Sequence, residues 1–213
     1  DAGITRLPDE STILRFRHLL EQNNLGQQIL ATVNARLMER GLMLKSGTVV
    51  DATLIAAPSS TKNDKGARDP EMHQIQKGKQ WYFGMKAHIG VDADSGLVHT
   101  VTTTAANAHD ITQAHALLHG EEDVVFADSG YRGVEKRQEI QEQHPDVDWQ
   151  IALMPGKRKT LDKIKTSHAL RDKLEKVKAS IRAKVEHPFR VIKCQFGHRK
   201  TRYRGLAKNT NQL

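Results

Sequence analysis

Cysteine is almost absent from the sequence, which has Cys194 alone among 213 residues. A single thiol forms neither a disulfide framework within the chain nor a multi-thiolate metal site, and this scarcity is typical of a reducing compartment. Long apolar runs are missing too. No stretch reaches the roughly 20 residues that a membrane helix needs, and no basic segment followed by an apolar one opens the chain. We therefore expect a cytoplasmic protein with no membrane contact.

Acidic residues are in the minority. The chain has 33 Lys and Arg against 25 Asp and Glu, a formal net charge of +8. Such an excess favours a polyanionic partner such as nucleic acid, although charge alone does not say which polyanion. Hydrophobic residues make up 38% of the chain, and its length is enough to bury a sizeable core in one domain.

The two ends of the chain lack the usual features of complete termini. The sequence begins at Asp1 rather than Met, and it stops at Leu213 within a polar run. We interpret it as a fragment that is shortened at its C-terminus.

Hydrophobic spacing predicts a mixed α/β domain. Residues 11–40 carry apolar positions at helical spacing with a break near 23–26, which predicts two short helices. Residues 60–80 are polar and are expected to form a loop. The other expected elements are strands over 42–60, 124–130 and 149–155, a hairpin over 81–104 with its turn at 94–96, and helices over 107–120, 132–144 and 157–187. The helix over 107–120 is expected to be capped near Asp110. We therefore predict a helical segment at 1–44 that leads into a domain at 45–213.

Three isolated carboxylates lie in distinctive settings. Asp51 in TVVDATLI and Asp128 in VVFADSGYRG each follow an apolar β-branched run, so each is expected where a strand ends and a divalent cation has access. Glu186 lies four residues after Arg182 in a helical pattern, and Pro188 is expected to close that helix. Oxygen-only ligands of this kind suit Mg²⁺ or Mn²⁺.

Each of these residues also has an ordinary structural explanation. Asp51 can cap a turn, Asp128 can cap the helix that follows it, and Glu186 can pair with Arg182 on a helix surface. His187, next to Glu186, can contact phosphate or can interact with the helix dipole. The residues alone leave both interpretations open.

The motifs around the carboxylates occur together and in a particular order. TVVDATLI, ADSGYRG and RAKVEHPF with a following lysine resemble the catalytic domain of DDE-type insertion-sequence transposases, specifically the insertion-sequence-five group, which is related to the insertion-sequence-four superfamily. The opening DESTILRFRHLLE resembles the segment that precedes that domain. The resemblance covers nearly the whole chain.

The resemblance implies a fold and a catalytic site. The fold is α/β, an RNase H-like mixed sheet flanked by helices over 45–213, with an N-terminal helical segment. Asp51, Asp128 and Glu186 are implied to be both the catalytic residues and the ligands of two Mg²⁺ or Mn²⁺ ions.

The resemblance also implies DNA contacts and partners. Arg182 and Lys193 match the signature Tyr-x-x-Arg-x-x-x-Glu-x-x-x-x-x-x-Lys, but Ala179 stands where its tyrosine belongs. As cations, both suit phosphate rather than metal. We also expect Arg132 and His187 to contact DNA. The expected partners are double-stranded DNA, both transposon ends and target, and further copies of the chain, in a bacterial cytoplasm at the nucleoid.

Two other functions remain open. An RNase H-like nuclease would share the metal chemistry but would cut without strand transfer. A catalytically inactive DNA-binding remnant would retain the basic charge alone.

Overall fold

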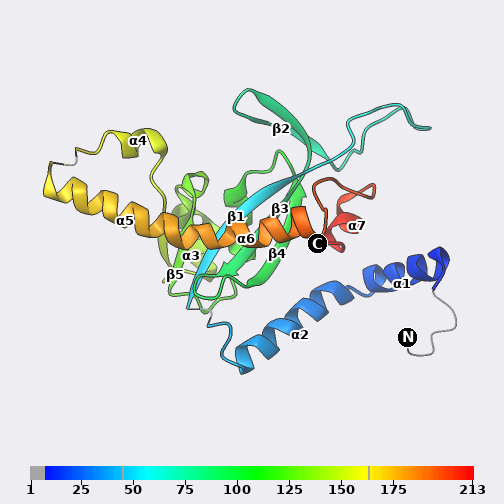
Figure 1. The fold of residues 1–213 in the computed structure, drawn as a ribbon, viewed down its shortest axis with the longest axis horizontal. Coiled ribbons are helices and arrows are strands. Elements are labelled where there is room, and N and C mark those ends of the chain that lie inside the picture. The colour runs from blue at the N-terminus through cyan, green and yellow to red at the C-terminus, as the bar shows by residue number, and fades with distance from the viewer. Residues whose placement is uncertain (1–7, 45, 163) are drawn as a thin grey trace.

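The computed structural model describes residues 8–44, 46–162 and 164–213. Within these residues the strands form one six-stranded sheet in the order β2-β3-β1-β5-β6, with β4 also paired to β3 (Figure 1). The strands are β1 (Gly47–Ala56), β2 (His73–Lys77), β3 (Gln80–Asp92), β4 (Val98–Ala105), β5 (Val124–Ala127) and β6 (Asp148–Ile151). The expected boundary between residues 44 and 45 falls at residue 45, which lies outside the described residues.

The sheet mixes both kinds of strand pairing. β1 is antiparallel to β3, whereas β1, β5 and β6 run parallel to one another. Helices flank this sheet, so the expected mixed α/β class is confirmed and is consistent with an RNase H-like fold. The hairpin expected over 81–104 is confirmed as β3 and β4, and β2 lies within 60–80, which was expected to be a loop.

The N-terminal helical segment forms two helices as expected. Asp9 caps the first, because its Oδ1 accepts a hydrogen bond from the Thr12 backbone N–H at 2.7 Å. Asn24 adopts the left-handed conformation and separates the two. The helices of the structure are α1 (Glu10–Gln22), α2 (Leu25–Glu39), α3 (Gln138–Gln143), α4 (Pro155–Lys159), α5 (Thr166–Arg182), α6 (Glu186–Arg190) and α7 (Leu206–Thr210).

The helix expected over 107–120 is wrong. The structure has two short 3-10 turns there, Asp110–Gln113 and His115–Leu117. Asp110 was expected to cap this helix, but its Oδ1 accepts a hydrogen bond from Lys86 Nζ at 2.8 Å. The Asp110 carboxylate is therefore engaged by Lys86 of β3 and does not cap a helix N-terminus.

Pro188 does not end the helix that precedes it. A 3-10 turn, Ala183–Val185, interrupts the hydrogen bonds after α5, and α6 then begins at Glu186, two residues before the proline. A proline in the first turn of a helix lacks only an N–H that has no intrahelical partner. The helical path continues through a π-helical turn over Val191–Gln195 (Figure 1).

The two faces of the sheet bury different clusters. Val49 of β1 packs with Val185 and Phe189, the buried residues around α6. Val50 points to the other face and packs with Tyr131. Because side chains alternate along a strand, Asp51 shares the face of Val49 and is directed toward the α5–α6 side.

Gly90 is expected to tolerate no side chain. A Cβ on this β3 residue would lie 2.4 Å from the Leu117 carbonyl oxygen and 2.6 Å from His99 Cε1. We expect Gly90→Ala to lower the free energy of unfolding by about 1–3 kcal/mol, measured in urea, because the core must be displaced. Gly156→Ala is the matched control, since its Cβ would meet nothing within 4 Å. Equal stability of the two variants would contradict the close approach.

Candidate active site

The sheet places Asp51 and Asp128 on neighbouring strands. Asp51 lies in the middle of β1, so its expected place at a strand end is wrong, because β1 stays paired with β3 as far as Ala56. Asp128 follows directly after β5, as expected. The two strands pair in parallel with Val50 opposite Ala127, so the next residue on each strand is one of the two aspartates. Adjacent strands lie about 4.8 Å apart, so the two backbones hold Asp51 and Asp128 side by side at the C-terminal end of β5.

Glu186 approaches from the helical side. It follows Val185, which is 1% exposed and packs against Val49 in the core. The pKa of Asp51 is raised from 3.8 to about 6, chiefly by burial and also by the negative charges of Asp128 and Glu186, while the Ala52 N–H and Arg182 oppose the rise. Residues that are far apart in the sequence thus act on Asp51 as one electrostatic group.

Local hydrogen bonds hold the two aspartates. Asp51 Oδ1 accepts from the Ala52 N–H at 2.7 Å, and Asp128 Oδ1 accepts from the Gly130 N–H at 2.8 Å. Asp128 therefore caps the 3-10 turn that follows it, which is close to its structural explanation, a helix cap. Arg182 Nη2 lies 3.9 Å from Asp51 Oδ2 and partly balances the negative charge.

Lys193 lies beside the same group. Its Nζ donates a hydrogen bond to Thr53 Oγ1 at 2.5 Å, and Thr53 is two residues beyond Asp51 in β1, on the same face. Burial lowers the pKa of Lys193, and so does the charge of Lys77, whereas Glu186 acts in the opposite direction. A half-buried ammonium group therefore borders the carboxylates.

The other two expected DNA contacts lie apart from Lys193. Arg132 is exposed and its Nη1 donates to Met154 Sδ at 3.2 Å, in a groove beside α5. His187 lines a mostly apolar hollow with Leu30 and Val101, between α2 and β4. No contact of the described residues joins either side chain to the three carboxylates.

Comparison with known proteins identifies the family. A family model described as "Transposase DDE domain" matches residues 43–213. The chain belongs to this transposase family. No solved structure matches the chain at a significant level.

Membership in the DDE transposase family indicates the broad function of the chain. The chain is a transposase-family domain, its substrate class is DNA, and the family uses divalent metal ions. No helix among the described residues is long and apolar enough to cross a bilayer.

Two residues near the transposase site were not expected from the sequence. Thr53 holds Lys193, and Tyr131 is fully buried with a hydroxyl that has no hydrogen-bond partner among the described residues. Burial raises the pKa of the Tyr131 phenol, with Asp110, Asp51 and Asp128 all close enough to contribute. The one available signal was the position of Tyr131, three residues after Asp128. A tyrosine there is equally typical of a core residue.

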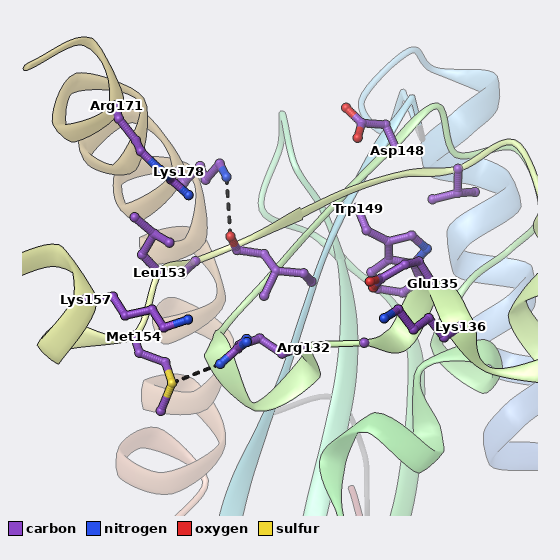
Figure 2. Close-up of a pocket in the computed structure, with 14 residues that line it drawn as sticks. Arg132, Glu135, Lys136, Asp148, Trp149, Leu153, Met154, Lys157, Arg171 and Lys178 are labelled. Carbon is purple, nitrogen blue, oxygen red and sulfur yellow. Dashed lines mark hydrogen bonds between the residues drawn. The ribbon is translucent and has the colours of Figure 1, made fainter. Parts of the chain in front are cut away.

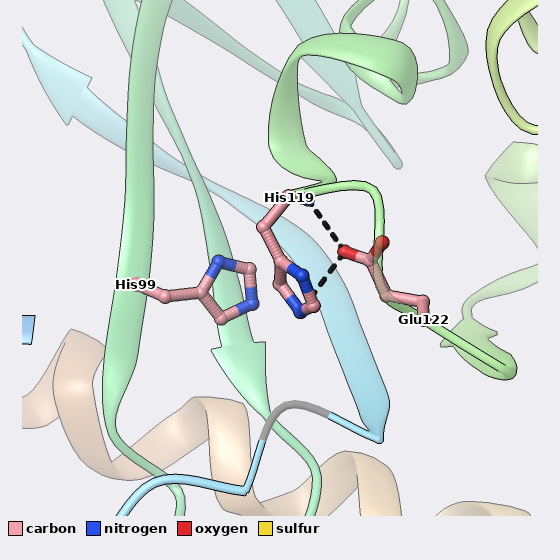
Figure 3. A group of neighbouring side chains, drawn as sticks. All are labelled: His99, His119 and Glu122. Carbon is pink, nitrogen blue, oxygen red and sulfur yellow. Dashed lines mark hydrogen bonds and ion pairs between the residues drawn. The ribbon is translucent and has the colours of Figure 1, made fainter. Parts of the chain in front are cut away.

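A second group can supply metal ligands. Among the described residues, His99, His119 and Glu122 offer ligand atoms that all lie within 4.8 Å of one another (Figure 3). The Glu122 carboxylate accepts hydrogen bonds from the backbone N–H groups of His119 at 2.7 Å and Gly120 at 2.8 Å. Thr48 Oγ1 contacts His99 Nε2 at 3.1 Å and donates to Glu122 at 3.3 Å.

This second group is well explained as a buried polar network. Its hydrogen bonds join the start of β1, β4 and the loop before β5, at the opposite end of β5 from Asp128. His119 Nδ1 accepts from the Glu121 N–H at 3.2 Å, so a neutral ring carries its proton on Nε2, the nitrogen that faces Glu122. A metal ion at that nitrogen would require the other tautomer. Among the described residues, the oxygen atoms of Asp51, Asp128 and Glu186 do not form a group as close as this one.

Proposed function

We propose that this chain catalyses metal-dependent cleavage of DNA at insertion-sequence ends and transfer of the freed end into target DNA, as a member of the insertion-sequence-five group. The observation that supports the proposal is the parallel pairing of β1 with β5, which sets Asp51 beside Asp128, while Glu186 lies near enough to help raise the pKa of Asp51. The three carboxylates come from β1, from the residue after β5 and from α6, and Asp128 and Glu186 lie near enough to Asp51 to act on its charge although the sequence separates them widely. Such a convergence is typical of a site that binds cations or catalyses a reaction.

The residues of the site fit divalent cations. Two further carboxylates, those of Asp128 and Glu186, act on Asp51, and Arg182 is the cation that pairs with it at 3.9 Å among the described residues. Excess negative charge with oxygen ligands suits Mg²⁺ or Mn²⁺. Asp51, Asp128 and Glu186 would hold the ions, which would activate the attacking oxygen and neutralise the charge on the leaving one.

The basic residues of the site orient the DNA. Lys193, fixed by Thr53, and Arg182, next to Asp51, are placed to contact phosphates that flank the bond to be cut. Asp51 must lose its proton before it can bind a cation, and its pKa of about 6 makes this happen below neutral pH. The same site then holds the 3′-hydroxyl for attack on target DNA. Because two ends must be brought together, we also propose that the chain acts as a homo-oligomer on DNA.

Strand transfer separates the proposed function from a nuclease and from an inactive remnant. We expect the chain, with Mg²⁺, to join a duplex copied from the end of its own element, with a pre-cut 3′-hydroxyl, to plasmid DNA. The joined product is measured on a denaturing gel. A matched duplex that ends in a 3′-dideoxynucleotide should give no product, because it lacks the nucleophile. Nicking without joining would indicate a nuclease, and DNA retention without either would indicate an inactive remnant.

A further inference from the structure

A large basic groove lies beside the free edge of the sheet. It has a volume of about 950 Å³ and runs between β6, α5 and the turns after Asp128 (Figure 2). β6 is the last strand in the sheet order, so one of its edges has no strand partner among the described residues. The cations that line the groove are Arg132, Lys136, Lys157, Arg171 and Lys178.

Most of this positive charge is not neutralised. Glu135 and Asp148 are the acids that line the groove. Among the described residues, Lys178 pairs with Glu175 at 3.4 Å, whereas the other four cations form no ion pair with a carboxylate. Four uncompensated cations around one hollow attract a polyanion.

An aromatic side chain stands among these cations. Trp149 of β6 is half-buried and packs against the core around Tyr131, and it lines the groove. Its indole Nε1 is buried and has no hydrogen-bond partner among the described residues. A basic groove with an aromatic surface is the combination that binds unpaired nucleotides, because the cations hold phosphates and the ring stacks on bases.

The size of the groove favours one strand over a duplex. Its volume is that of sites that enclose drug-sized molecules, roughly 300–1,000 Å³, which admits a few nucleotides but no double helix. Along α5, Arg171, Lys178 and Arg182 are seven and four residues apart, so they share one face of the helix. They span about 16 Å at 1.5 Å per residue, or roughly five nucleotides at 3.4 Å each.

We propose that this groove binds a single, unpaired DNA strand and leads it along α5 to the carboxylates around Asp51. Arg182 connects the two places, because it lies on the groove-facing side of α5 and contacts Asp51. The proposal has two parts. The claim that the bound strand is the strand being cut rests on the function proposed above. The claim that the groove binds unpaired DNA is independent of that function.

The fluorescence of Trp149 tests this inference directly. The chain has two tryptophans, and Trp81 is 62% exposed, so Trp81→Phe leaves Trp149 as the reporter with little risk to the fold. In EDTA, we expect a mixed-sequence single strand of about 12 nucleotides, longer than the groove spans, to quench Trp149. The same sequence as a blunt duplex should quench it less. Anisotropy of the labelled DNA measures total binding in the same samples.

Two double variants supply the matched comparison. In the Trp81→Phe background, Lys157→Ala with Arg171→Ala should weaken single-strand binding by roughly five- to tenfold. It should also reduce the slope of log affinity against log salt by about 1.4, for two phosphate contacts at roughly 0.7 each. Arg15→Ala with Lys173→Ala removes the same charge from exposed positions outside the groove and should change both values little.

Several results would overturn the inference. These are DNA binding without quenching of Trp149, equal quenching by the duplex, equal loss of affinity in the two double variants, or no binding of the single strand at all. Nicking with Mg²⁺ is scored separately on the unaltered chain. Nicking without quenching of Trp149 would support the proposed function and contradict DNA binding in the groove. Quenching without nicking would support DNA binding in the groove and contradict the proposed function.

Discussion

Asp51→Asn is expected to reduce Mg²⁺-dependent nicking of DNA about a thousandfold, because a metal ligand contributes several kcal/mol to transition-state stabilisation. Asparagine keeps the size of the side chain and can still accept the hydrogen bond from the Ala52 N–H. It removes only the negative charge that binds the cations. The initial rate of conversion of supercoiled plasmid to the nicked circle measures the effect.

Asp128→Asn and Glu186→Gln should have comparable effects, since each is expected to hold one ion. Asp64→Asn is the matched control, because Asp64 is exposed in the polar loop. This variant should nick DNA at the normal rate. Retention of DNA at equal salt should stay similar in all four variants, since the phosphate contacts remain. Normal nicking by any of the three site variants would show that its carboxylate is not a metal ligand.

The same Asp51→Asn change is expected to stabilise the metal-free chain at neutral pH, by about 2 kcal/mol. Folding raises the pKa of Asp51 from 3.8 to about 6, so the folded state holds the proton more tightly than the unfolded state does. Stability is therefore greatest below about pH 4, and it is lost as the pH rises toward about 6. Asparagine carries no charge and avoids this loss.

Urea unfolding in EDTA at several pH values measures the difference in stability. The two proteins should be nearly equal at pH 4, and the variant should gain its full advantage by pH 7. Mg²⁺ should reverse the order at pH 7, because it binds the ionised site of the unaltered chain and stabilises the folded state. A difference in stability that does not change with pH would show that the ionised Asp51 carboxylate does not destabilise the folded state.

Much of the fold could be predicted from the sequence where local pattern and final structure agree. The alternation around residues 94–96 predicted the hairpin, and the break at Asn24 predicted two helices, because both depend on neighbouring residues. The helix expected after Asn107 failed because Lys86, distant in sequence, takes the Asp110 carboxylate. The prediction that Pro188 ends the helix failed because the 3-10 turn over Ala183–Val185 comes first, and a new helix begins after it with Pro188 in its first turn.

Some residues of the candidate site could likewise be predicted from the sequence, and others could not. The flanking motifs singled out Asp51, Asp128 and Glu186, and the net charge of +8 pointed to a polyanion. Neither Thr53 nor Tyr131 carried a signal that distinguishes it from an ordinary strand or core residue. The groove around Trp149 could not be predicted either, because its cations come from separate segments.

The sequence by itself determined most of the element types, the family resemblance and the candidate carboxylates, since these follow from local spacing and residue chemistry. Only the tertiary structure decided which of these residues act on one another. The parallel pairing of β1 with β5 places Asp51 beside Asp128, and the packing of Val185 against Val49 brings Glu186 to the same face. Strand register and core packing join residues that are distant in the chain. For this reason the grouping of charges around Asp51, and the basic groove beside β6, exist only in the folded protein.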